Sequence, residues 1–388
     1  MLALLMTFTL VACSGGNNGG TSNNSGAANT DSSAEKDTFK IAVAASMTGE
    51  NAEFGLGYRY ATEMAVEEWN AKGGVLGKQV EVVVYDDKGS GDEAASVAQK
   101  ICADPDVVAV MGHFSSGISM TAGAVYQQNG MIQLDSSSSH TDLTKTGEYI
   151  FQNNNMTFVE GQDVVDIAIE VLGATKLGLI YIESDWGNSA AEVVVEYFNE
   201  KYGDSGVELV GPEFVLSGSG NDDFSLAISK MTNAGVDVCV VGGEYGMSAP
   251  VCNQYKAVDP DIKFTGYSSM YSQYLLDLAG ESVEGVIFPI SFFPGSNDPD
   301  LRAFIDTYTE RYDMTPTSYA TQCYDGVYCL FETIEKVGTL DRATIRDALA
   351  EATYDGVAGH IEFDEERHVF RSPVRLIIEN GEYKEYAG

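Results

Sequence analysis

Apolar positions along the chain follow strand and helix periods in turn from Phe39 onward. The apolar run over 39–46 predicts a strand, and a stripe at the i, i+3, i+4 and i+8 positions counted from Ala61 then predicts a helix. Gly73 and Gly74 supply a left-handed stop for that helix. The alternation continues with strands over 80–86, 107–111 and 131–135 and with helices over 93–103 and up to 125. Strands that alternate with helices predict a parallel sheet covered on both faces.

The same alternation restarts at Phe158. Val165, Ala168, Ile169 and Leu172 form the apolar stripe of a helix. The unit is completed by strands over 176–182, 207–214, 236–242 and 262–267, by a helix over 190–202, and by helices after 223 and 244. The repeat predicts an α/β protein with two similar, doubly wound lobes in tandem.

The remaining C-terminal part is too small for a third domain. It predicts a strand over 285–290, helices over 299–311, 318–337 and 341–351, and strands over 360–364 and 373–379. We expect it to return and pack on both lobes, so that several interlobe strands form a hinge. The predicted lobes are 39–157 plus 287–371 for the N-terminal lobe and 158–286 plus 372–388 for the C-terminal lobe.

Two facing lobes of this kind predict one ligand cleft, because ligands bind beyond the carboxyl ends of the strands in open α/β sheets. The loops at those ends cover 46–56, 112–117, 135–141, 183–188, 242–247 and 266–271. They carry hydroxyls, aromatic rings and few charges, which suits a small zwitterion. Ser115 and Ser116 begin a predicted helix, which indicates a binding site for a carboxylate. A serine at this position can instead serve only as the N-cap of the helix.

The N-terminus is typical of a bacterial lipoprotein signal. A short apolar run leads through small residues to Cys13, so residues 1–13 are the predicted signal segment and Cys13 the lipidated residue. No Lys or Arg precedes the run, which departs from the full pattern. Residues 14–38 are rich in Ser, Asn and Gly and predict a disordered tether. Apolar runs after residue 40 are shorter than the ~20 residues that a spanning helix needs.

Composition narrows the possible partners. Lys plus Arg number 22 and Asp plus Glu 58 in the 388 residues, a net charge of −36. That charge repels phosphate backbones and argues against nucleic acid. With Cys13 assigned to lipid, an odd number of cysteines remains and none forms C-x-x-C, so their pairing stays open. These are Cys102, Cys239, Cys252, Cys323 and Cys329.

Motifs of enzymes and metal sites are absent from the sequence. It has no G-x-S-x-G, no Walker A loop and no H-E-x-x-H. His113, His140, His360 and His368 show no ligand spacing. We therefore expect a protein that is not an enzyme, with no metal and no cofactor.

The chain resembles the periplasmic branched-chain amino acid (leucine/isoleucine/valine) binding proteins of ABC transporters, from about Lys40 to Glu382. The order and spacing of several strings carry this resemblance: NAKGGVLGK, VYDD, GHFSSG, DSSSSHTDLT with GEYIFQNN, DWGNSAA, GGEYG and SYATQCYDGVYCL. It implies the type I periplasmic binding protein fold that the periodicity also predicts.

The resemblance also implies a function. We expect an extracytoplasmic solute-binding lipoprotein that captures a branched-chain or other apolar amino acid in the interlobe cleft. It would deliver this ligand to the permease subunits of an ABC importer. We expect a monomer, anchored through Cys13 to the outer face of the bacterial cytoplasmic membrane. A ligand-binding receptor of a sensory system, and a binder of a non-amino carboxylate or amide such as an aromatic acid, remain alternatives.

Site residues follow from the resemblance position by position. It places Ser116 and Ser139 on the carboxylate and ammonium of the ligand, with Ser115 beside them and the Ser137 carbonyl as an acceptor. Aromatic residues would line or close the side-chain pocket: Phe54, Phe114, Trp186 and Tyr324.

One position departs from the family. Ser268 matches the place where the leucine binders carry the glutamate that pairs with the ammonium. Glu244, where those binders have a tyrosine, could take that role, and Asp325 is a second, more structural candidate. A disulfide found in some members would need cysteines at Gly89 and Ser115 and cannot form here.

Overall fold

The computed structural model describes residues 37–217 and 222–388. Cys13 and residues 14–36 of the predicted tether lie outside the described residues. Thr38, the last residue of that predicted tether, already belongs to the first strand.

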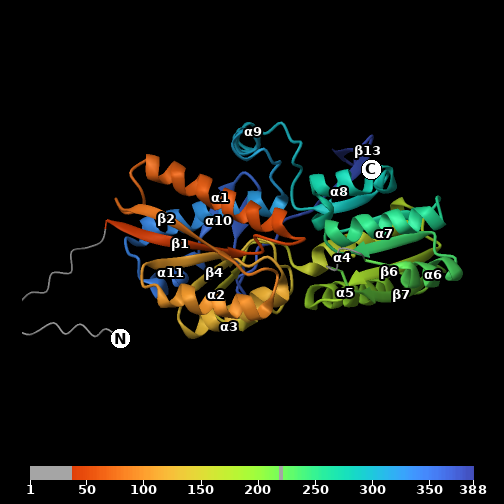
Figure 1. Ribbon diagram of the computed structural model, residues 1–388, viewed down its shortest axis with the longest axis horizontal. Coiled ribbons are helices and arrows are strands. Elements are labelled where there is room, and N and C mark those ends of the chain that lie inside the picture. Colours follow the sequence, from red (N-terminus) through yellow and green to blue (C-terminus); the bar gives the residue numbers. More distant parts are fainter. Residues whose placement is uncertain (1–36, 218–221) are drawn as a thin grey trace, which may run out of the picture. The chain divides into compact units, whose positions relative to one another are not determined.

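The first lobe is built on a five-stranded parallel sheet in the order β2-β1-β3-β4-β5. Its strands are β1 (Thr38–Ala45), β2 (Gln79–Asp86), β3 (Val107–Gly112), β4 (Ile132–Asp135) and β5 (Ile150–Gln152). Its helices in this part of the chain are α1 (Ala52–Ala71), α2 (Gly91–Ala103) and α3 (Ser116–Gln128). Figure 1 shows α2 and α3 on one face of the sheet and α1 on the other. The predicted strands and helices of this region are confirmed, and β5 is additional.

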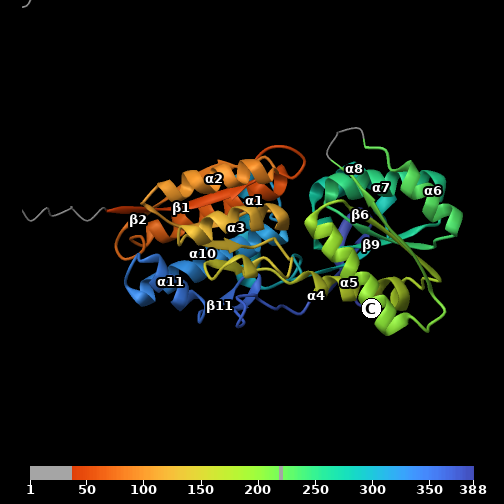
Figure 2. The same cartoon turned by 90° about the horizontal axis from the view of Figure 1, so that it is seen from below.

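The second lobe repeats this topology. Its seven-stranded sheet has the order β14-β13-β10-β9-β8-β6-β7, and β7-β6-β8-β9-β10 follows the same strand pattern as the first sheet. The strands are β6 (Lys176–Ile182), β7 (Glu208–Val215), β8 (Val238–Gly242), β9 (Lys263–Gly266) and β10 (Ile287–Ile290). Its helices are α4 (Thr157–Asp166), α5 (Asp185–Tyr202), α6 (Ser225–Ala234), α7 (Tyr245–Val258) and α8 (Gln273–Ala279). Figure 2 shows α6, α7 and α8 on the opposite face from α4 and α5.

Side chains that alternate along β1 explain why both faces of the sheet are covered. Ile41 and Val43 are fully buried in the cluster that includes residues of α1, whereas Ala42 and Ala44 are buried with residues of α2 and α3. Successive residues of a strand point to opposite faces, so a continuous apolar run requires a helical layer on each side.

The C-terminal part returns to both sheets. Helices α10 (Ser318–Val337) and α11 (Arg342–Leu349) follow α9 (Pro299–Tyr312), and α10 packs along α1 in the first lobe. The hairpin β11 (Thr353–Gly356) and β12 (Gly359–Glu362) is a separate sheet. Strands β13 (Val374–Glu379) and β14 (Glu382–Glu385) extend the second sheet, with β13 antiparallel to β10 and β14 antiparallel to β13.

One predicted boundary is wrong. Residues 287–290 were expected in the first lobe, but Ile287 pairs with Thr265 of β9 and with Ile377 of β13, so β10 belongs to the second sheet. The interlobe segments are also less regular than the predicted strands. Segments around 153–156 and 367–373 run beside each other, and Asn155 holds both the amide and the carbonyl of Arg371 through its side chain.

Within 37–217 and 222–388, none of the helices combines the length and the apolar character needed to cross a bilayer. The five cysteines of these residues carry free thiols, which answers the pairing question that the sequence left open.

Candidate functional site

The predicted loops do meet at the carboxyl ends of the strands. A small cavity lies there, with walls from both lobes. Its lining residues are Phe114, Ser115, Ser116 and Ser137 from the first lobe, Trp186, Glu244 and Ser269 from the second, and Tyr319 from α10. Six of the ten predicted ligand residues are among these eight.

Asp135 fixes the loop that presents Ser137. Its Oδ1 accepts the backbone amides of Ser137 and Ser138 at 2.9 and 2.8 Å and the Tyr58 hydroxyl at 3.1 Å. Its Oδ2 accepts the hydroxyls of Ser119 and Ser138 at 2.5 and 2.6 Å. Burial raises the pKa of this carboxyl, and the hydrogen bonds that it accepts act in the opposite direction. The same hydrogen bonds attach the carboxyl to the turn. The turn is thus rigid where it meets the cavity.

The N-terminus of α3 supplies the donors expected for a carboxylate. The first amides of a helix have no acceptor within the helix and carry its positive end. The Ser116 hydroxyl is buried and has no hydrogen-bond partner among the described residues. Gly112, at the end of β3, leads toward this helix with a φ of 135°. Only glycine fits there, because a β-carbon would collide with the carbonyl oxygen of Ala44. A free hydroxyl at a helix start is suited to an anion.

Aromatic rings form the apolar part of the wall. Phe54 stacks on Phe114 with ring centroids 4.5 Å apart, and Tyr319 packs edge-on against both. Phe54 is fully buried, so it supports Phe114 from behind and does not itself line the cavity. From the other lobe, Trp186 packs edge-on against Tyr267.

Glu244 brings the one carboxylate of the lining, which contains no Lys, Arg or His. It stands at the N-cap position of α7 without a side-chain capping bond and lines the cavity from the second lobe. Burial raises the pKa of its carboxyl, and the nearby Glu50 carboxylate raises it further. A half-buried carboxylate without a cation is only partly solvated, so this side chain favours a ligand that brings a positive charge.

Direct contacts hold the two lobes together over the cavity. The Trp186 indole donates to the Ser139 hydroxyl at 2.9 Å. The Tyr245 hydroxyl donates to the Glu50 carbonyl, and the Ser272 hydroxyl to the Glu53 carboxylate. These bonds describe a closed cleft.

The closed cavity is too small for an amino acid. Its volume is about 30 Å³, whereas pockets for small molecules usually measure roughly 300–1,000 Å³. A ligand can therefore enter only when these interlobe contacts separate or the lining side chains move.

Two further predicted residues lie behind the cavity wall. The Ser139 hydroxyl contacts Trp186 and Thr157. Ser268 donates its amide to Glu160 and lies 3.3 Å from the Tyr319 hydroxyl. The Ser137 carbonyl, expected to accept from a ligand, already accepts from the Asn154 amide at 2.7 Å.

Tyr324, expected at the ligand, is not among the eight lining residues of the cleft cavity. Its hydroxyl donates to Glu68 at 2.6 Å, and its ring contacts Phe304. Asp325 is structural, because it accepts the amides of Val357 and Ala358 at 3.0 and 2.7 Å.

Sequence reasoning missed Tyr319, Ser269 and Glu160. Tyr319 lies in the first turn of α10, in the same string that suggested Tyr324. Ser269 adjoins the predicted Ser268, and Glu160 lies beneath it with burial raising its pKa to about 7. A helix start beside the cleft loops was the available signal for Tyr319.

Histidine serves structure in the first lobe. His113 is fully buried, with Nδ1 2.6 Å from the Asp87 carboxylate and Nε2 3.0 Å from the Tyr126 hydroxyl. In the described part of the chain, no group of three or more His, Cys, Asp or Glu side chains is placed to hold a metal ion.

The sequence matches a family that fits this geometry. The family model described as periplasmic binding protein matches residues 38–377. The chain belongs to the periplasmic binding protein family. The predicted α/β fold with two doubly wound lobes is confirmed, and the cleft of this binding protein lies where the two sheets end.

Characterised relatives are similar over nearly the whole chain. A leucine-, isoleucine-, valine-, threonine- and alanine-binding protein of Pseudomonas aeruginosa is 28% identical over 332 residues, which cover 85% of this chain and 86% of that protein. A leucine-binding protein of Thermotoga maritima has a TM-score of 0.82 at 25% identity, covering 90% of this chain and 98% of that one. A branched-chain amino acid transporter substrate-binding protein of Streptococcus pneumoniae, solved with isoleucine, has a TM-score of 0.81 at 27% identity, covering 90% and 99%.

Proposed function

We propose that this binding protein captures an apolar α-amino acid, in particular a branched-chain one, between its lobes and delivers it to an ABC importer. The observation that carries the proposal is that one cavity has a hydrogen-bond donor on one lobe and a carboxylate on the other. The free Ser116 hydroxyl at the start of α3 is suited to a carboxylate, and Glu244 in the other lobe is suited to an ammonium. The similar Pseudomonas aeruginosa protein, named for leucine, isoleucine and valine binding, and the Streptococcus pneumoniae protein solved with isoleucine support the same ligand class.

In this proposal each lobe holds one end of the ligand. The α3 amides and Ser116 bind the carboxylate through the first lobe, and Glu244 accepts from the ammonium through the second. Phe114, Trp186 and Tyr319 cover the side chain, with about 25 cal/mol stabilisation per Å² of buried apolar surface. Because the two charged ends contact different lobes, the ligand itself stabilises a form in which the lobes close around it, with the lining side chains moved apart to make room.

The localisation belongs to the same proposal. Lipidation of Cys13 would hold a monomer at the outer face of the cytoplasmic membrane, beside the permease that receives the ligand.

A second candidate is a carboxylate or amide without an amino group, such as an aromatic acid. Two points favour it: the cavity wall is aromatic, and the family resemblance matches Ser268 to the place where the leucine binders carry a glutamate. In that case Glu244 would have no ammonium to contact.

A thermal-shift screen over amino acids and simple organic acids separates the two candidates. Ligand at 100 times its Kd adds about 2.7 kcal/mol to the free energy of unfolding. We expect a shift with at least one apolar amino acid, abolished in Ser116→Ala combined with Ser139→Ala. Stabilisation only by acids that lack an amino group would contradict the amino-acid proposal.

A further inference from the structure

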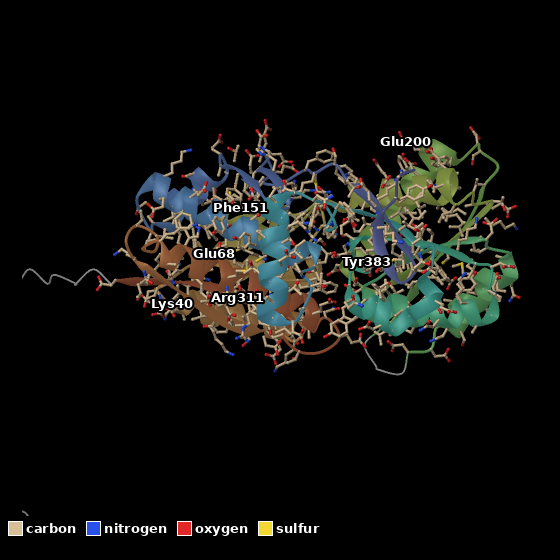
Figure 3. All side chains as sticks on the ribbon, turned by 90° about the horizontal axis from the view of Figure 1, so that it is seen from above. Lys40, Glu68, Phe151, Glu200, Arg311 and Tyr383 are labelled. Atoms are coloured by element: carbon tan, nitrogen blue, oxygen red, sulfur yellow. The ribbon has the colours of Figure 1, made fainter. Side chains whose placement is uncertain are left out.

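A second cavity lies apart from the cleft, with most of its lining from the first lobe and Glu385 from β14 of the second sheet. Its volume is about 930 Å³, and its walls come from α1, α9, α10, the β11–β12 hairpin, β14 and the segment 291–298 that leads into α9. It shares no lining residue with the cleft cavity. Figure 3 marks Glu68 of α1, which contributes to its wall.

A row of aromatic rings covers one side of this second cavity. Phe304 of α9 contacts Tyr324 of α10 with ring centroids 4.7 Å apart. Tyr324 contacts Tyr328 at 4.9 Å, and Tyr328 contacts Tyr354 of β11 at 6.1 Å. All four residues line the cavity. Aromatic faces carry partial negative charge and attract cations.

Glu68 adds a fixed negative charge beside these rings. The hydroxyls of Tyr324 and Tyr328 both donate to its Oε2, the first at 2.6 Å. Its Oε1 has no partner among the described residues. The two tyrosines therefore hold one carboxylate oxygen in place and leave the other available to a donor in the cavity.

The rest of the lining has the same sign of charge. None of its lining residues is Lys, Arg or His. Four more carboxylates border the cavity: Asp298, Asp300, Asp355 and Glu385. His360, outside the lining, pairs with Asp355 at 2.6 Å. Lys72, also outside it, lies with Nζ 5.4 Å from the centroid of the Tyr328 ring, so this ring already contacts one cation.

We propose that this cavity, with Glu68 and the rings of Tyr324 and Tyr354, is a binding site for a small organic cation, in particular a quaternary ammonium compound. An anion would be repelled by the carboxylates. Among the described residues, no three His, Cys, Asp or Glu side chains come together to hold a bare metal ion. Rings beside a carboxylate are the surroundings that recognise alkylated ammonium groups. The site is separate from the cleft and does not depend on the cleft ligand.

Calorimetric titration with choline tests the site, with its uncharged carbon isostere 3,3-dimethylbutan-1-ol as the matched ligand. We expect choline to bind and the isostere not to bind. Glu68→Gln should raise the Kd for choline by about tenfold, since the favourable charge is lost while the shape is kept. Glu63→Gln is the matched control on α1, because Glu63 pairs with Arg59 and lies outside the cavity lining.

Two more variants keep the test decisive. Tyr354→Leu removes one ring without touching Glu68 and should also weaken choline binding, which covers the case that Glu68→Gln does not fold. Glu244→Gln locates the bound cation: if this variant removes choline binding while Glu68→Gln does not, the cation enters the cleft and the proposal is wrong. Equal binding of choline and its isostere, or no binding of choline at millimolar concentration, would also overturn it.

Discussion

Trp186 donates its indole N–H to the Ser139 hydroxyl at 2.9 Å, and this bond joins the two lobes at the edge of the cleft cavity. Ser139 follows β4 of the first sheet, whereas Trp186 lies in the first turn of α5 in the second lobe. Ser139 also lies 3.0 Å from the Thr157 hydroxyl, so the acceptor is held in place from behind. Trp186 therefore belongs both to the cavity lining and to the contact between the lobes.

We predict that Trp186→Phe weakens ligand binding. The phenyl ring keeps an aromatic wall but loses the bond to Ser139, which costs about 0.5–1.5 kcal/mol, or roughly a two- to tenfold higher Kd. Calorimetric titration with the ligand from the screen measures the change. Trp69→Phe is the control, because Trp69 lies on α1 and its indole N–H has no partner among the described residues. Equal losses in both variants would exclude a specific role for the interlobe bond.

Glu244→Gln should weaken amino-acid binding by about tenfold or more, because a hydrogen bond to a charged group contributes about 1.5–3 kcal/mol. Affinity of the unmodified protein should also decrease as the pH falls through the raised pKa of Glu244, since the protonated carboxyl no longer attracts an ammonium. Glu50→Gln removes one cause of that raised pKa and should shift the decrease to lower pH. A ligand affinity that does not respond to Glu244→Gln would contradict the assigned role.

Stability should fall as the pH rises toward 8. Burial raises the pKa of Glu53, Glu160 and Asp325 to about 7 in each case. A carboxyl whose folded pKa is raised stabilises the fold when protonated, and this contribution is lost as the pH rises through about 7. We expect a higher Tm at pH 5.5 than at pH 8, with a smaller difference in Glu53→Gln. A Tm that increases over this interval would contradict the expectation.

Closure should be visible in solution. Because the closed cavity holds only about 30 Å³, a ligand must enter an opened cleft and then bring the lobes together by hinge motion. Small-angle scattering should show a smaller radius of gyration at ligand saturation than without ligand. An unchanged radius at saturation would count against the hinge.

Anchoring is tested at Cys13. Expressed with a complete signal peptide, Cys13→Ala should appear in the medium or remain unprocessed, whereas the parent protein fractionates with membranes. Cys102→Ala, in a half-buried position of α2, is the control that keeps Cys13. If Cys13→Ala still fractionates with membranes like the parent, the lipid anchor is wrong.

Local periodicity was sufficient to predict most of the fold. A strand covered on both faces must be apolar throughout, and a helix covered on one face must carry an apolar stripe. These patterns can therefore be recognised in the sequence, as in β1 and β6 for strands and in α1 and α10 for helices. Short strands carry too few residues for a period. The sequence therefore missed β5, β11 and β14, which span three or four residues each.

Long-range packing decided what remained. Ile287–Ile290 reads as a strand in either lobe, and only its pairing with β9 and β13 assigns it to the second. Tyr319 and Tyr324 lie in one string, but five residues of helix separate them by about 7.5 Å along the axis and about 140° around it. One ring consequently lines the cleft and the other contacts Glu68.

The sequence by itself determined the alternating elements, the two repeated units and the loops that form the site, because these depend on neighbours within a few positions. Only the tertiary structure decided which side chains face each other across the cleft. The hydrogen bond between Trp186 and Ser139 joins residues 47 positions apart, and Glu244 shares the cavity with Ser116, which lies 128 positions earlier in the chain. No local pattern encodes such contacts, which arise when two sheets built from distant segments of the chain pack against each other.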